Sequence, residues 1–222
     1  MPSPRIEDTI KALFDAERAV REAHEELAGE DPKALLPALD KAVRKAAALD
    51  EDEASLRLVR VAGVLGELEG PAVVDLLVDI LGSEAPEARH EAGEELAALA
   101  WERFKEVALG VERALERLPS DSVALLELPY LLADIPEPGV LKLLGRFLRH
   151  ENVDVVVSTV EALAEAGDPE ALPLLTPLMK DARRVQMEDD GGTEGEVAVG
   201  ELVAEAVEML KGNGRGVRKD ST

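Results

Sequence analysis

Apolar residues recur every three or four positions along most of the chain, which is the spacing of one face of an α-helix. The first such stretch follows Ser3-Pro4, where an N-cap hydroxyl precedes a proline at the first helical position. It ends near Gly29, so the pattern predicts one long amphipathic helix. The residues of its apolar stripe are Ile6, Ile10, Leu13, Ala16, Val20, Ala23 and Leu27.

Further helices follow, most of them separated by turns rich in proline, glycine, serine or aspartate. They are predicted at residues 32–46, 52–68, 71–82, 86–100, 102–118, 121–134, 139–149, 153–166, 169–180 and 196–211. In the helix at 52–68, the residues expected to face the core are Leu56, Val59, Ala62, Leu65 and Leu68. The β-branched run at 153–157 also suits a strand, but helical spacing continues through Val160 and Leu163 behind an N-cap residue, Asn152, so we predict a helix.

These helices form pairs of nearly constant length. Pro71, Pro138 and Pro169 each open the first helix of a pair, and an unmarked start near Phe104 completes the series. Successive starts lie about 33 residues apart, a period typical of helical solenoids. One such hairpin buries too little apolar area to offset the ordering of its backbone, so neighbouring hairpins must share a core. The pattern therefore predicts an all-α fold, an α-α superhelix of about five helical hairpins.

Three segments follow from this pattern. Residues 1–29 are predicted to form an N-terminal capping helix, residues 30–211 the repeat solenoid, and residues 212–222 a disordered basic tail. Within the last pair, residues 185–195 contain three glycines and four acidic residues, where a repeat of this kind usually has a tight turn. We expect an exposed loop or hairpin tip there.

The composition supports helices and limits the class of partner. Hydrophobic residues make up 46% of the chain but aromatic residues only 2%, so the core must consist mainly of leucine, valine and alanine. The formal charge is −22, which repels phosphate backbones and anionic lipid surfaces. We therefore expect no nucleic-acid or membrane partner. The chain has no cysteine and its N-terminus has no apolar run of the secretory type, which favours a cytoplasmic protein.

Two segments carry a resemblance to a known family. Residues 167–175, Gly-Asp-Pro-Glu-Ala-Leu-Pro-Leu-Leu, followed by Lys180-Asp181, resemble the first helix of a HEAT repeat, and residues 88–96 resemble the second. The resemblance extends over about 33–211 and is closest to the short HEAT-like repeats of phycobilisome lyases. It implies an armadillo-like helical solenoid, with Pro173 kinking the last first-helix rather than breaking it. The residues of that helix expected to pack inward are Leu172, Leu174, Leu175 and Leu178.

The candidate chemistry is weak. Each histidine precedes a glutamate, at His24, His90 and His150, and the deoxyhypusine hydroxylases, a HEAT-like family that this chain resembles, hold iron with such pairs. Only His90-Glu91 occupies an equivalent place, and a metal site needs ligands that converge. The acidic loop does not have the spacing of a calcium-binding EF-hand loop. No nucleophile elbow or phosphate-binding glycine loop is present. We predict no catalytic residue, no cofactor and no metal.

The residues expected to contact a partner lie on the second helices of the repeats, which should line a shallow concave face. They are Glu87, Glu91, Glu94, Glu95, Glu161 and Glu165, with Asp189 and Asp190 of the loop at 188–196 as a secondary site. Trp101 and Phe104 sit one turn apart at a repeat junction. They are either core residues or an exposed aromatic anchor for a partner.

We expect a protein–protein interaction scaffold that binds a basic or helical partner on an acidic surface. Two alternatives stay open. One is a structural subunit that self-associates, as a homodimer, through a terminal element such as the N-terminal helix. The other is a metal-dependent hydroxylase or bilin-lyase-type enzyme.

Overall fold

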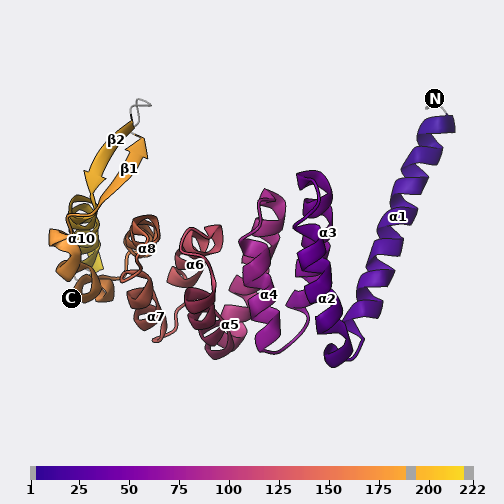
Figure 1. The fold of residues 1–222 in the computed structure, drawn as a ribbon, viewed down its shortest axis with the longest axis horizontal. Helices are drawn as coiled ribbons and strands as arrows, with labels where there is room; N and C mark the ends of the chain where they lie inside the picture. Colours follow the sequence, from indigo (N-terminus) through magenta and orange to yellow (C-terminus); the bar gives the residue numbers. More distant parts are fainter. Residues whose placement is uncertain (1–3, 189–193, 218–222) are drawn as a thin grey trace.

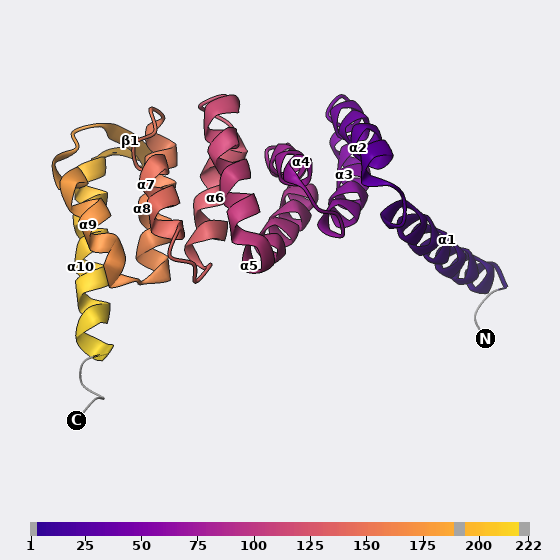
Figure 2. The same ribbon diagram turned by 90° about the horizontal axis from the view of Figure 1, so that it is seen from below.

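The computed structural model describes residues 4–188 and 194–217, and it is a curved stack of helical hairpins (Figure 1). The two ends of the chain lie at opposite ends of the stack (Figure 2). The elements are α1 (Pro4–Ala28), α2 (Pro32–Ala46), α3 (Glu51–Gly66), α4 (Pro71–Leu81), α5 (Pro86–Arg117), α6 (Val123–Ala133), α7 (Val140–Phe147), α8 (Val153–Ala166), η1 (Pro169–Ala171), α9 (Leu172–Leu175), η2 (Thr176–Lys180), β1 (Arg184–Glu188), β2 (Glu194–Ala198) and α10 (Val199–Val217). The prediction of an all-α solenoid is confirmed.

Five hairpins make up the stack behind α1. Helix α2 pairs with α3, α4 with the first half of α5, the second half of α5 with α6, and α7 with α8. The segment from η1 to η2 pairs with α10. In each pair we refer to the earlier element as the first helix and the later one as the second helix.

Side-chain caps and prolines set the helix boundaries. The carboxylates of Asp31, Asp50 and Asp168 and the side-chain oxygen of Asn152 each accept a hydrogen bond from a backbone N–H in the first turn that follows. The Asn152 cap begins α8 at Val153, so the β-branched run is helical, as predicted. None of the described helices has the length and apolarity needed to span a bilayer.

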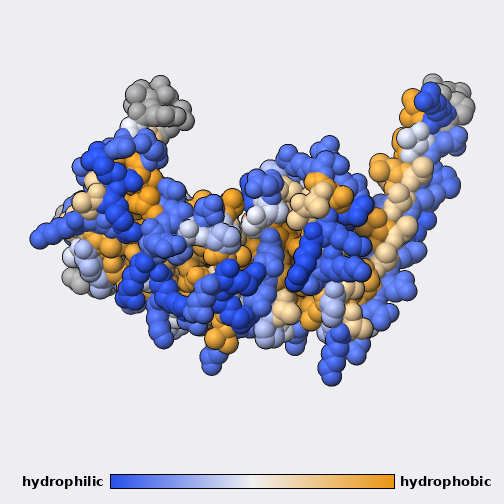
Figure 3. Space-filling model, viewed as in Figure 1, coloured by the Kyte–Doolittle hydropathy of each residue, from blue (hydrophilic) through white to orange (hydrophobic). Residues whose placement is uncertain are grey.

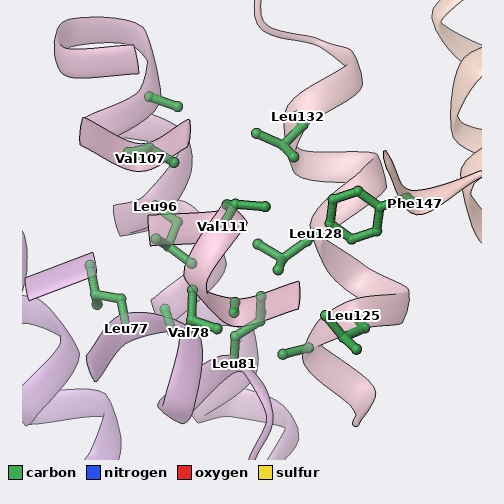
Figure 4. Packing of buried hydrophobic residues seen from close by; sticks show 14 of the residues in the cluster. Leu77, Val78, Leu81, Leu96, Val107, Val111, Leu125, Leu128, Leu132 and Phe147 are labelled. Atoms are coloured by element: carbon green, nitrogen blue, oxygen red, sulfur yellow. The ribbon is translucent and has the colours of Figure 1, made fainter. Parts of the chain in front are cut away.

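The core is continuous across the repeats and is almost wholly aliphatic (Figure 4). Leucines, valines and alanines fill it, and Phe147 is its largest fully buried side chain. Within the described residues the one fully buried polar side chain is Thr159, whose hydroxyl donates to the carbonyl of Val155 one turn earlier. The expected leucine, valine and alanine interior is thus present. Leu56, predicted to face the core, is instead 64% exposed.

Helix α5 serves two repeats because it changes direction at Arg103, whose backbone leaves the helical region with φ −137° and ψ 48°. The Arg103 guanidinium donates a hydrogen bond to the carbonyl of Leu68, with an N–O distance of 3.0 Å. One turn further on, the Glu106 carboxylate accepts from the N–H of Gly70 at 2.8 Å. Both contacts attach the kink to the turn between α3 and α4, so the previous repeat fixes where the next one starts.

The last repeat departs most from the prediction. Its first helix is not α-helical throughout: a single α-helical segment, Leu172–Leu175, lies between two 3₁₀ segments, because Pro173 and Pro177 both lack the N–H that an α-helix requires. The backbone nevertheless stays in the right-handed helical region on both sides of Pro173, so this proline does not break the helix, as expected. The four leucines do pack inward, with Leu175 buried and the other three partly buried against the core.

A two-stranded antiparallel sheet includes part of residues 185–195, where an exposed loop or hairpin tip was expected. Strands β1 and β2 pair from Arg184 opposite Ala198 to Glu188 opposite Glu194. Val185 is buried at the base, and the Arg184 guanidinium donates to the carbonyl of Glu196 across the strands. Helix α10 therefore begins at Val199, after the strand, and it runs to Val217, where a disordered tail from 212 was predicted. Residues 218–222 lie outside the described part.

Helix α1 has the predicted length but covers the end of the stack only in part. Its last turns meet α3, where the Glu17 carboxylate lies 3.9 Å from the Arg60 guanidinium and His24 Nε2 lies 2.8 Å from Glu67 Oε1. The rest of the helix projects from the stack with its apolar side chains in solvent (Figures 1 and 2).

Candidate functional site: an acidic surface on the second helices

The second helices lie side by side along one edge of the stack. In Figure 1, α3, α6 and α8 form the upper side, while α1 and the β-hairpin project upward at its two ends. The row of second helices therefore lies between two projecting elements, α1 and the β-hairpin. All six glutamates predicted to contact a partner lie in this row, on α5 and α8.

Helix α5 contributes a ridge of carboxylates. Glu87, Glu91, Glu94 and Glu95 recur at helical spacing, with Glu87 and Glu94 exposed and the other two half-buried. A backbone hydrogen bond lowers the pKa of Glu87, and the Ser55 hydroxyl of α3, which donates to the Glu87 carboxylate at 3.0 Å, lowers it further.

Trp101 and Phe104, the two aromatic residues that follow this ridge on α5, have different surroundings. Trp101 is 61% exposed, whereas Phe104 is partly buried against the core and lies over Gly139 at the start of the next repeat. The kink at Arg103 lies between them and turns the two side chains in different directions. Trp101 is thus available to a partner, while Phe104 packs the repeat junction.

Three carboxylates and a histidine meet where α1, α3 and α5 approach each other. The Glu95 carboxylate rests on Gly66 and leaves no room there for a Cβ. Burial and the nearby carboxylates of Glu91 and Glu67 raise the pKa of Glu95, while His24 opposes that effect. The structure therefore holds like charges close together at this point, with one histidine as the nearby counter-group.

A shallow groove of about 250 Å³ joins α5 to α6. Its lining includes His90 and Glu94 from α5 and Glu127 and Leu131 from α6. Arg89 also lines it, but its guanidinium donates to the backbone carbonyls of Ser83 and Glu84. Leu131 approaches α5 closely because Gly93 carries no side chain. The groove therefore places carboxylates of two successive repeats around one partly apolar floor.

The same surface continues from α6 to α8. The Tyr130 hydroxyl donates to Glu161 Oε2 at 2.7 Å. Burial and this hydrogen bond, together with the charges of Glu161 and Glu165, raise the pKa of the Tyr130 phenol, which thus stays protonated and keeps donating. Glu165 lies one turn further along α8 and is exposed.

The charge of this surface is largely uncompensated. Neither α6 nor α8 contains a lysine or arginine. Within the described residues, Glu91, Glu94, Glu127 and Glu165 form no ion pair. The first helices differ, because their acids pair across repeats with arginines: Asp75 with Arg113 at 2.9 Å, Asp79 with Arg117 at 2.5 Å, and Glu112 with Arg146 at 2.9 Å.

Two members of the surface, Glu67 and Glu127, were not predicted. Glu67 follows the end of α3, and Glu127 lies in a short, mostly apolar helix. A signal was present for the second of them, since no lysine or arginine occurs between Leu118 and Leu141. Asp189 and Asp190, the predicted secondary site, lie outside the described residues.

The three histidines lie at separate places. His24 faces Glu67, His90 lines the groove between α5 and α6, and His150 Nδ1 accepts from the N–H of Asn152 at 3.2 Å. Among residues 4–188 and 194–217, no group of three or more side chains is arranged to hold a metal ion.

Comparison with known proteins gives a match to helical repeats. A family model of HEAT repeats matches residues 111–188, from the second half of α5 through β1. The chain is similar to a crystal structure of an engineered protein, with 22% identity, coverage of 88% of this chain and 90% of that one, and a TM-score of 0.35. It is also similar to a designed armadillo repeat protein, with 15% identity, coverage of 85% and 98%, and a TM-score of 0.31. No curated protein matched the chain. The finer resemblance to phycobilisome-lyase repeats stays a prediction.

Proposed function

We propose that the chain is a non-catalytic scaffold that binds a basic segment of another protein across the second helices of its repeats. The observation that carries this proposal is the contrast between the two faces. Acids of the first helices, including Glu112 and Glu116 in the second half of α5, are paired with arginines. The acids at 87–95 in the first half of α5 and those of α6 and α8 form no ion pair with a lysine or arginine among the described residues.

The energetics of the acidic surface favour a cationic ligand. Burial contributes most to the raised pKa of Glu95, and the nearby carboxylates of Glu91 and Glu67 add to it, so keeping these three groups charged side by side costs free energy. Lysine or arginine side chains placed among these carboxylates would relieve that repulsion on binding. The field of the whole chain, at −22, would also speed the encounter with a basic partner.

The shape of the surface favours a partner that crosses several repeats. The carboxylates run from α5 to α8, with the groove between Glu94 and Glu127 in the middle. Trp101, exposed on α5, offers an aromatic face on which an arginine of the partner would stack. An arginine-rich extended or helical segment can both cross several repeats and stack an arginine on Trp101.

Fluorescence titration with a basic probe tests this function. Trp101 is the only tryptophan, so its emission reports binding near the acidic surface without a label. The probe is an arginine- and alanine-rich peptide, and an acidic peptide of the same length is the negative control. We expect Glu94→Lys with Glu127→Lys to weaken binding by about ten-fold or more, because two unpaired carboxylates become cations.

A matched control separates local contacts from the overall field. Glu30→Lys with Glu151→Lys changes the net charge equally at two exposed turn positions outside the second helices. We expect that double variant to lose only about two-fold. Equal losses in the two double variants, or no binding of the basic peptide by the native chain, would contradict the proposal.

A further inference from the structure

The projecting half of α1 carries an apolar stripe that no described residue covers. Ile6, Ile10, Leu13 and Phe14 recur at helical spacing, and Leu13 and Phe14 are 64% and 60% exposed. In Figure 3 the orange and tan atoms of this arm lie along its inner side, which faces the stack, while its outer side is blue. A contiguous apolar face of this kind on a projecting helix is typical of an interaction site.

A groove beside the other half of α1 has a complementary character. It measures about 650 Å³ and lies between α1, α2 and α3. Its apolar lining comes from Val20, Ala38, Ala42, Leu56 and Val61, and its cations are Lys41, Lys45, Arg57 and Arg60.

This groove exists because α1 and α3 diverge. The two helices run in the same direction and touch at Glu17–Arg60 and, two turns later, at His24–Glu67. One turn before the first of these contacts, Leu13 and Leu56 are both 64% exposed. The helices have therefore separated there, and the opening between them is lined by apolar residues of both.

Unpaired charges also match between the stripe and the groove. Lys41 and Lys45 form no ion pair with any residue in the described ranges, in a chain that otherwise has an excess of acid. Glu7 and Asp8, beside the start of the stripe, likewise have no ion pair within 4–188 and 194–217. The acids flank the apolar stripe and the lysines flank the apolar groove.

We propose that two copies of this chain associate through α1, with the two α1 helices antiparallel and the projecting half of each seated in the groove of the other. The stripe and the groove lie at opposite ends of one helix, so a two-fold axis brings each stripe to the other copy's groove. Such an interface covers the exposed apolar end of the solenoid, which terminal repeats normally protect with a polar face. It also leaves the acidic surface on α5, α6 and α8 free.

Analytical ultracentrifugation of the full chain over a range of concentrations tests the association. We expect a dimer that Ile10→Glu with Leu13→Glu dissociates, raising the dissociation constant by about 100-fold or more, because two carboxylates would enter an apolar interface. Both side chains are exposed in the single chain, so the variant should keep its circular dichroism and its Tm at concentrations where the native chain is monomeric. The control is Leu109→Glu, an equally exposed leucine (57%) on the second half of α5.

A charge exchange tests the proposed orientation. Lys41→Glu with Lys45→Glu replaces the two unpaired cations of the groove with acids, and Glu7→Lys with Asp8→Lys gives a basic helix end. We expect each double variant alone to be mainly monomeric and an equimolar mixture of the two to form a heterodimer. A native chain that stays monomeric up to about 100 μM would overturn the proposal, since seating of α1 on its own α3 or on another protein would then account for the stripe. Dimers that the Ile10/Leu13 variant leaves intact, or a mixture that fails to pair, would overturn it as well.

Discussion

At the scale of single residues, glycines set how closely the first helices pack. A Cβ placed on Gly110 of α5 would lie 2.2 Å from Val74 Cγ1 and 2.9 Å from Val74 Cβ on α4. Valine has one strongly preferred rotamer in a helix, so it cannot turn aside. The bare backbone at Gly110 is therefore what lets two successive first helices approach here.

Gly110→Ala should destabilise the fold by about 2–3 kcal/mol, because the added methyl forces apart two buried helices. Urea denaturation followed by circular dichroism measures the effect. The control is Gly212→Ala in α10, where nothing lies within 4 Å of the added Cβ and helix propensity predicts a gain of up to about 1 kcal/mol. A Gly110 variant as stable as the native chain would show that α4 and α5 separate without cost.

The spacing of apolar residues predicted the helices, but it did not predict for every apolar side chain whether it is buried. Trp101 and Phe104 are indistinguishable by spacing, yet only Phe104 packs inside. The difference comes from Arg103, whose hydrogen bond to the Leu68 carbonyl joins residues 35 positions apart. Such a contact between repeats has no signal in the local pattern. The exposure of Leu56 has a similar origin, since it depends on where α1 leaves α3.

At the scale of elements, the helices were predictable and their interruptions were not. Asn152 marks the start of α8 in the sequence and in the structure alike, whereas Asp50 caps α3 at Glu51, one residue before the predicted start. The two strands were not predicted, because the acids and glycines at 185–195 favour an exposed loop or hairpin tip without indicating strands on either side. A two-residue alternation is present in β1, where Val185 is buried and Met187 partly buried, but five residues are too few to outweigh the surrounding helical pattern.

The junction of α1, α3 and α5 should respond to pH through Glu95. Burial and the carboxylates of Glu91 and Glu67 raise its pKa, so the folded chain binds this proton more readily than the unfolded chain. Stability from this group is therefore highest below the ordinary carboxylate pKa and falls as pH rises through the raised value. At pH 7, Glu95→Gln should increase the Tm by about 1–3 °C, a small shift because the side chain is only half-buried.

The advantage of Glu95→Gln should disappear near pH 4, where the native carboxyl is already protonated. Calorimetry at pH 4 and pH 7 measures both values. Glu94→Gln is the matched control, because its carboxylate is exposed on the same helix. A Tm gain of the same size at both pH values, or a loss at pH 7, would contradict this account of the junction.

At the scale of the whole molecule, the charge pattern links stability to binding. The first helices hold their neighbours through arginine–carboxylate pairs that are partly exposed, and each such pair contributes about 0–1 kcal/mol. The acidic surface adds a repulsion that acts from the end of α3 to α8. Because each repeat contacts only its neighbours, this repulsion is not offset by a compact globular core.

Salt should therefore stabilise the free protein and weaken its complex with a basic partner. Salt screens both attraction and repulsion, but with 47 acidic against 25 basic residues the repulsion between carboxylates outweighs the attraction within ion pairs. Raising sodium chloride from about 20 mM to about 500 mM, where the Debye length shortens several-fold, should raise the Tm by a few degrees and reduce the affinity for the arginine-rich peptide. The Glu94→Lys, Glu127→Lys variant should show a smaller rise in Tm, because its surface repels itself less. If the Tm falls with salt, the arginine pairs of the first helices dominate the electrostatics, and the acidic surface then holds too little repulsion for a cationic partner to relieve.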